Sequence, residues 1–337
     1  MGEMRLRPIA FAFVLALSGC GQSDEERRLA DVEKRLETLA QTPIVGLGEY
    51  SPADIRAGWK TDFSRHTVPL AQFRSGGPGK DGIPAIERPR FRSTVATKLD
   101  EDEPVIELVV RGRARAYPLE IMVWHELVND TVAGRPIVVT FCPLCHTALA
   151  FDRRLDGNVL SFGTTGNLRN SDLVMYDRQT ESWWQQFGGA GVVGRHAGRR
   201  LERVPARIVS WGDFRLAHPR ALVLSRDTGY SRDYGRDPYP GYDDVDSPPY
   251  FQVANSDDRR LAPKERVVFV EVGRDAFAVP RTVLARGPVR IGPLAMRLRG
   301  SRVDVRLAGR PVPFDEPFWF AVAAFRPDVQ IVRESSS

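Results

Sequence analysis

The sequence predicts an α+β fold that is mainly β: a β-rich body with an internal degenerate repeat, preceded by a helical spacer. Three observations support this prediction. Strand-like apolar runs alternate with Gly-containing turns from residue 104 onward, heptad-like apolar spacing occurs before residue 45, and one hairpin pattern occurs twice. The 337 residues are 42% hydrophobic and 27% charged, a globular composition that excludes a disordered or collagen-like chain.

The first residues are typical of an export signal. Arg5 and Arg7 precede an apolar run over residues 9–17, which is about half of the ~20 residues that a membrane-spanning helix needs. The run ends in Leu-Ser-Gly-Cys, which resembles the bacterial lipobox. That resemblance implies that residues 1–19 are a lipoprotein signal peptide and that Cys20 carries lipid, which anchors the chain to the membrane. Because no Asp follows Cys20, it also implies the outer membrane of the cell envelope, facing the periplasm.

The next segment, residues 20–45, has the pattern of a lipid-anchored helical spacer. Four apolar residues recur between charged ones at heptad-like spacing: Leu29, Val32, Leu36 and Leu39. This predicts an amphipathic helix over 24–40 that ends before Pro43. Two heptads are short for an independent coiled coil, so we expect a solvated spacer.

Turn residues divide the expected CxxC-containing domain, residues 46–262, into a loop-rich and a strand-rich part. Gly and Pro are frequent up to residue 100, so we expect mostly loop there. Beyond it the pattern predicts, in order, a hairpin over 105–118, a helix over 119–128, a strand over 136–141 and a hairpin over 148–162.

One hairpin pattern returns near the C-terminus. Residues 104–118 and 266–280 each read as a hydrophobic strand, a Gly/Arg turn and an Ala-x-Ala-x-Pro strand, and Gly-Arg-Pro follows both. The second copy has no cysteines and stops early. We therefore expect a degenerate C-terminal β repeat over residues 263–337, with the chemistry confined to the first copy.

Charge and motifs exclude several classes of protein. The net charge of +5 is a small surplus of 48 Lys and Arg over 43 Asp and Glu, so we expect no nucleic-acid partner. Gly-x-Ser-x-Gly, His-Glu-x-x-His and the dinucleotide-binding glycine fingerprint do not occur in the sequence. Their absence disfavours serine hydrolases, zinc metalloproteases and NAD enzymes.

The candidate catalytic residues are Cys142 and Cys145, at the end of the predicted strand over 136–141. No third thiol is left to pair with them if Cys20 is lipidated. Four interpretations stay open: a soft-metal site, a dithiol redox centre in which Cys142 attacks and Cys145 resolves, a c-type haem attachment site, and a structural thiol pair.

A metal site needs further ligands, and the candidates are His125, His146 and Met175. A Cys/His/Met set favours copper, whereas Cys and His alone suit zinc. His146 completes a Cys-x-x-Cys-His signature for haem c. Because that signature lies between two predicted β-strands, haem is the least favoured cofactor.

A second functional class is a non-catalytic binding module for an envelope protein or a small molecule. The polar stretch 163–172 is expected to be a loop that presents hydrogen-bond donors. Paired tryptophans such as Trp183 and Trp184 usually belong to the core, but Trp183 is also a candidate for contacting a cofactor, together with Tyr234 and His146. Tyr234 belongs to a Tyr/Asp/Pro-rich loop over 230–250, which holds five of the eight tyrosines.

Three motifs together resemble one known family: Trp-His-Glu-Leu-Val-Asn-Asp at 124–130, Thr-Phe-Cys-Pro-Leu-Cys at 140–145, and Asn-Ser-Asp-Leu-Val-Met-Tyr-Asp-Arg at 170–178. They look like a widespread prokaryotic family catalogued as a domain of unknown function, from about residue 83 to 281. In that family Gly or Asn commonly follows the second Cys, whereas this chain has His146. The resemblance therefore favours His125 over His146 as a ligand. It implies no activity, so we expect a cell-envelope lipoprotein with a CxxC site for soft-metal binding or metal-dependent redox.

Overall fold

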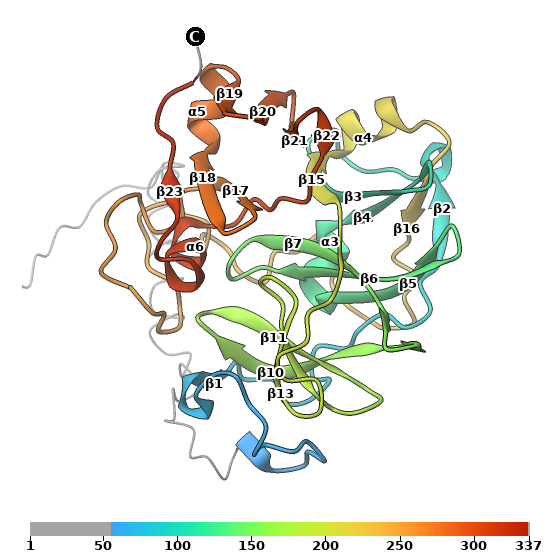
Figure 1. Cartoon of the computed structure of the whole chain (residues 1–337). Helices are drawn as coiled ribbons and strands as arrows, with labels where there is room; N and C mark the ends of the chain where they lie inside the picture. The colour runs from blue at the N-terminus through green and yellow to red at the C-terminus, as the bar shows by residue number, and fades with distance from the viewer. Residues whose placement is uncertain (1–54, 336–337) are drawn as a thin grey trace, which may run out of the picture. The chain divides into compact units, whose positions relative to one another are not determined.

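The computed structural model describes residues 55–335, in which mostly antiparallel strands are the main regular structure and helices are few (Figure 1). The predicted signal peptide and helical spacer lie outside these residues. The described part contains five sheets of three or more strands and one two-stranded ribbon. Its helices are short, and none of them is long and apolar enough to span a membrane. The prediction of a mainly β protein is therefore confirmed.

Two sheets hold the predicted functional residues. The first has the strand order β1 (Phe73–Ser75), β10 (Phe162–Arg169), β11 (Asp172–Asp177), β12 (Trp183–Gln185) and β13 (Ala190–Val193). The second has the order β14 (Arg203–Val204), β7 (Thr147–Asp152), β6 (Arg135–Cys142) and β5 (Leu127–Val132). The 3₁₀ helix η1 (Leu70–Gln72) directly precedes β1. The two-stranded ribbon of β8 (Arg154–Leu155) and β9 (Asn158–Val159) connects β7 to β10. One apolar cluster contains buried residues from both sheets, including Val138, Leu149, Leu173 and Trp184.

The remaining sheets are built around the two predicted hairpins. The third sheet has the order β15 (Ala206–Ser210), β3 (Pro104–Val110), β4 (Arg113–Pro118), β16 (Leu222–Leu224) and β2 (Phe91–Ser93), which η2 (Thr94–Ala96) follows. The fourth has the order β17 (Val267–Val272), β18 (Asp275–Pro280) and β23 (Gln330–Ile331). The fifth has the order β19 (Val289–Ile291), β20 (Leu294–Arg299), β21 (Arg302–Leu307) and β22 (Arg310–Pro311). The helices are α3 (Leu119–His125), α4 (Trp211–Ala217), α5 (Arg281–Arg286) and α6 (Trp319–Phe325).

The internal repeat is visible in the structure and is longer than the sequence suggested. Each hairpin, β3–β4 and β17–β18, has a two-residue turn and runs directly into a helix, α3 or α5. In the first copy β15 pairs with β3, with Ser210 opposite Pro104; in the second, Phe318 forms the matching bridge to Arg266. A helix, α4 or α6, and a strand parallel to the second hairpin strand then complete each copy. The expectation that the second copy stops early is therefore wrong.

The copies differ mainly in what lies between the hairpin and the returning segment. In the first copy that insertion contains β5 to β14, which carry the CxxC sequence, whereas the second copy has only α5 and β19 to β22. The described residues fall into one compact unit.

Three local predictions need correction. The helix expected over 119–128 ends at His125, and β5 begins at Leu127. The stretch 163–172 is mostly the strand β10, because its polar side chains are hydrogen-bonded within the sheet; the Thr165 hydroxyl, for example, donates to the Val174 carbonyl at 2.6 Å. The hairpin expected over 148–162 forms only around its turn, where β8 pairs with β9; Phe162 begins β10, which pairs with β1 and β11 and not with β7.

Candidate functional site

The two cysteines lie at a tight turn between neighbouring strands. Cys142 is the last residue of β6 and stands opposite Thr147, the first residue of β7. Both cysteines are free thiols with exposed fractions of 1% and 0%. Pro143 lies inside the turn, where it removes one ladder hydrogen-bond donor and helps the strand to end. The local sequence thus holds both sulfurs in the turn that joins the two central strands of the second sheet.

Asp172 reaches the same point from the first sheet. It is fully buried at the start of β11, directly after a turn in which Asn170 and Ser171 both have left-handed φ angles, of 54° and 58°. Its carboxylate and the two sulfurs all lie within 4.8 Å of one another. We call Cys142, Cys145 and Asp172 the Cys–Asp trio.

Hydrogen bonds fix the Asp172 carboxylate in place. One oxygen, Oδ1, lies 3.0 Å from the Cys145 sulfur and accepts the thiol hydrogen bond. The other, Oδ2, accepts from the Phe187 backbone N–H at 2.9 Å and from the Gln185 side-chain amide. Such outer contacts orient a ligand before any ion binds.

A second polar group supports Cys145 from the other side. The Thr147 hydroxyl donates to Gln186 Oε1 at 2.7 Å, so its oxygen accepts from the Cys145 thiol at 3.0 Å. Gln186 Nε2 in turn donates to the Thr140 hydroxyl at 2.8 Å. The single thiol proton of Cys145 therefore faces two acceptors, one from each sheet.

Burial sets the protonation of the site. It raises the pKa of Cys142 and raises that of Cys145 well above its usual value. Burial likewise raises the pKa of Asp172 to about 6 and that of Glu126 to about 8, with the charge of Asp172 adding to the latter shift. A thiol with a raised pKa is a poor nucleophile at neutral pH, whereas a bound cation would favour the deprotonated sulfurs and carboxylates.

His125 is not part of the Cys–Asp trio. It is fully buried at the end of α3, with Nδ1 2.7 Å from the Pro84 carbonyl and Nε2 2.6 Å from the Tyr234 hydroxyl. Nδ1 must therefore donate, and Nε2 accepts from Tyr234, whose own oxygen lies 2.6 Å from the Thr228 hydroxyl. Both ring nitrogens are occupied, and this histidine orders the tyrosine-rich loop.

His146 lies next to the thiol turn but also outside the trio. Its Nδ1 is 3.3 Å from the Glu316 carbonyl, and its ring packs against Phe141 and Phe318. Burial and the nearby guanidinium groups of Arg266 and Arg281 lower its pKa to about 3, so the ring is neutral at physiological pH.

The other predicted contact residues have different surroundings. Met175 is fully buried in the same apolar cluster as the two cysteines. Trp183 is instead a core residue: its ring makes edge contacts with Trp59, Phe63 and Phe73 at centroid distances of 5.1 to 5.3 Å, and it lines none of the described pockets. Tyr234, bonded to His125, lines none of them either.

A pocket of about 320 Å³ lies beside the thiol turn. Its aromatic and turn residues include Phe141, Pro143, His146, Tyr239, Tyr242 and Phe318. The Tyr242 hydroxyl donates to the Leu144 carbonyl at 2.8 Å, which ties the tyrosine-rich loop to the CxxC turn. The charged lining is mainly acidic: Glu103, Glu120, Asp237 and Asp243, against Arg236. We call this pocket the acidic cleft. It reaches the thiol turn at Pro143 and His146.

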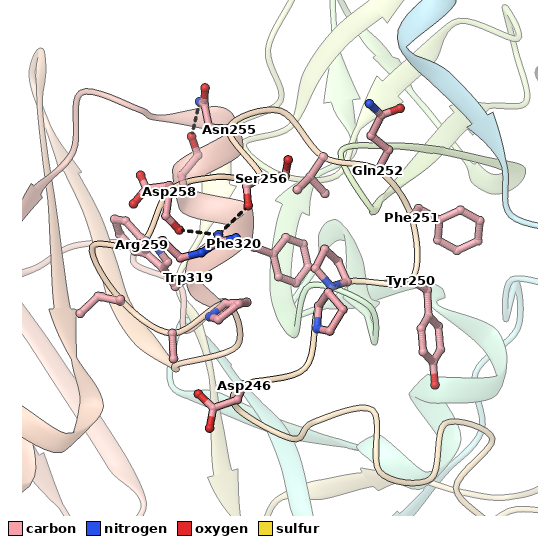
Figure 2. A pocket seen from close by; sticks show the side chains of 17 residues that line it. Asp246, Tyr250, Phe251, Gln252, Asn255, Ser256, Asp258, Arg259, Trp319 and Phe320 are labelled. Carbon is pink, nitrogen blue, oxygen red and sulfur yellow. Dashed lines mark hydrogen bonds between the residues drawn. The ribbon is translucent and has the colours of Figure 1, made fainter. Parts of the chain in front are cut away.

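A larger pocket, of about 710 Å³, does not include the trio. Figure 2 shows it between the end of the tyrosine-rich loop, with Tyr250 and Phe251, and α6, with Trp319 and Phe320. Arg259 lies at its edge and donates to the Ser256 carbonyl at 2.7 Å. We call it the loop pocket.

Sequence reasoning did not assign a role to several residues that the structure brings to the site: Thr147, Asp172, Gln185, Gln186 and Glu126. Glu126 and Asp172 lie inside motifs that resemble the family, so the sequence could have suggested them as carboxylate ligands beside the CxxC pair. Gln185 and Gln186 follow two tryptophans, a context that does not indicate a polar site. Only the structure shows that they hydrogen-bond to Asp172 and Thr147.

Comparison with known proteins gives one match. No curated protein and no solved structure matches the chain. The model of the family described as "Protein of unknown function (DUF3179)" matches residues 80–296, which includes all three motifs, the Cys–Asp trio and the second hairpin. The chain is thus a member of the DUF3179 family of proteins of unknown function.

Proposed function

We propose that the protein is an envelope lipoprotein whose Cys–Asp trio binds a soft or borderline metal ion, with zinc favoured over copper. The observation that supports this proposal is the convergence of two thiols and a hydrogen-bonded carboxyl within 4.8 Å in a buried polar site. A structural thiol pair would need no carboxyl beside it.

The donor set favours zinc. Zn²⁺ accepts Cys sulfur and carboxylate oxygen in tetrahedral sites, and its two positive charges offset most of the negative charge of the ionised trio. Copper(I) prefers sulfur ligands and would need Met175 in place of Asp172. When bound, zinc would hold the sulfurs deprotonated and act as a Lewis acid; the chain itself supplies the oriented donors and the acidic cleft through which a cation can approach.

Metal analysis of the full chain, purified without oxygen and loaded with zinc or copper, tests the proposal. We expect about one zinc per chain in the wild type, loss of the metal in the Cys142→Ser/Cys145→Ser double variant, and at least about tenfold weaker binding in Asp172→Asn. Asp257→Asn, an exposed aspartate outside the trio, is the matched control and should bind as the wild type does.

The outcomes separate the alternatives. Equal metal in the wild type and the double cysteine variant would reject the metal site. A chain that binds no metal but readily forms a Cys142–Cys145 disulfide would favour dithiol redox instead.

The lipobox at Cys20 supports the cellular part of the proposal. Lipid on Cys20 would hold the chain at the outer membrane, with the site in the periplasm. A Cys20→Ser variant should lose incorporation of labelled palmitate and move from the membrane fraction to the soluble one. Unchanged fractionation and labelling would contradict the anchor.

The loop pocket favours the binding module as a second candidate function. Its aromatic lining and the 55% exposed Tyr250 provide a recognition surface at the end of the Tyr/Asp/Pro-rich loop. The combined change Tyr250→Ala and Phe251→Ala should then abolish cross-linking to envelope partners while the zinc content stays unchanged. Loss of zinc without loss of cross-links would argue against a separate binding role.

A further inference from the structure

Glu126 has a backbone conformation that glutamate rarely adopts. It caps the C-terminal end of α3 with φ 58° and ψ −32°. Side chains with a Cβ clash in this region, and helix ends that need a positive φ usually have Gly or Asn there. Residues with such strained backbone conformations are often found at functional sites.

The Glu126 side chain is largely buried, and its carboxyl has no partner among the described residues. The residue is 7% exposed, and within residues 55–335 no group donates a hydrogen bond to its carboxyl and no cation pairs with it. Buried carboxyls normally have such partners, because leaving them without one is unfavourable. By contrast Glu120, in the first turn of α3, is paired with Arg226.

Glu126 also lies beside the trio. Its carbonyl accepts the Phe141 N–H at 2.8 Å, so it stands next to the residue that precedes Cys142. Its charge interacts with that of Asp172 and with the Cys142 sulfur. The carboxyl without a partner is therefore next to the only described cluster of Cys, Asp, Glu and His residues that could hold an ion.

We propose that Glu126 supplies the fourth protein donor of the metal site; this inference rests on the proposed zinc binding by the Cys–Asp trio. Three donors leave one position of a tetrahedral ion open, and two thiolates with two carboxylates carry the same formal charge as a Cys₄ zinc site. Glu126 is not among the groups within 4.8 Å of one another, so its carboxyl reaches the ion by rotating its flexible side chain. The four donors then come from the end of α3, the end of β6 with the turn after it, and the start of β11.

The test compares zinc affinity and cobalt spectra of full-length variants. Competition with a chromophoric chelator should give a zinc dissociation constant at least about tenfold higher for Glu126→Gln than for the wild type, and no change for Asp257→Asn, the exposed control outside the site. With Co²⁺ as the probe, the wild type should show the intense visible bands of a four-coordinate site, and Glu126→Gln should change their position or intensity. Glu126→Asp, which keeps a shortened carboxylate, provides a second variant if the amide prevents folding.

Each result has a distinct meaning. Weakened zinc binding with an altered cobalt spectrum supports Glu126 as a ligand. Equal affinity and identical cobalt spectra in the wild type, Glu126→Gln and Glu126→Asp would overturn this inference and leave the Cys–Asp trio intact. A wild-type chain that binds neither ion would refute the proposed function itself, and the inference with it.

Discussion

Asp315 is a buried carboxyl that the fold accommodates better as the neutral acid. One oxygen accepts from the Ala148 and Glu316 backbone N–H groups at 3.3 and 2.8 Å, and the other has no partner. Burial raises its pKa from 3.8 to about 7, although the charge of Arg203 acts in the opposite direction. We predict that Asp315→Asn, which keeps an acceptor oxygen and removes the charge, stabilises the protein more at pH 8 than at pH 5.

The size of the effect follows from proton linkage. Between pH 5 and pH 7 the native carboxyl keeps its proton, whereas the unfolded one, with a pKa near 3.8, has lost it. The native state binds more protons, so the free energy of unfolding falls as the pH rises, by about 1.4 kcal/mol per pH unit. Over this interval the wild type should lose about 2–3 kcal/mol relative to Asp315→Asn, and little more above pH 7.

Urea unfolding of both proteins at pH 5, 6, 7 and 8, with chelator present, measures this difference. Asp213→Asn is the matched control: hydrogen bonds from Ser301 lower the pKa of Asp213, so it is ionised in both states over this range. Its effect on stability should not vary with pH. A difference between Asp315→Asn and the wild type that is equally independent of pH would refute the reasoning.

Two further predictions concern packing. Trp183→Ala removes the ring that Trp59, Phe63 and Phe73 surround, and should lower the free energy of unfolding by about 3–5 kcal/mol; a loss under about 1 kcal/mol in urea titration would contradict a core role. Lys264→Met removes a buried ammonium group that donates to the Ser247 hydroxyl at 2.6 Å and to a loop carbonyl, and should make the tyrosine-rich loop easier to cleave in limited proteolysis, with wild-type cleavage rates as the contrary result.

The two repeated hairpins and the thiol turn could be predicted because they depend on neighbours in sequence. An apolar run, a Gly/Arg turn and a second strand pattern are sufficient to define β3 and β4, and a mostly apolar run precedes Cys142. The repeat was also detectable, but its full length was not. The segment opposite Arg266 forms only isolated bridges, one of them through Phe318, and its relation to β15 appears only in the pairing.

Which residues lie beside the thiols could not be predicted, because this depends on contacts between segments that are far apart in the sequence. Asp172 reaches the thiols because Asn170 and Ser171 adopt left-handed conformations that the sequence does not require. The predicted ligand His125 lies within the helix expected over 119–128, but α3 ends at this residue, and its imidazole is hydrogen-bonded to Tyr234. A single sequence carries no signal for these pairings.

The backbone N–H of Phe318, near the end of the chain, donates to the Cys145 carbonyl at 2.9 Å. A chain emerging from the ribosome or a translocation channel therefore exposes its thiols long before the segment that covers them has been delivered. In an oxidising compartment this interval leaves the sulfurs open to premature oxidation, and a product truncated ahead of Phe318 would retain every family motif yet lack the cover over its thiol turn.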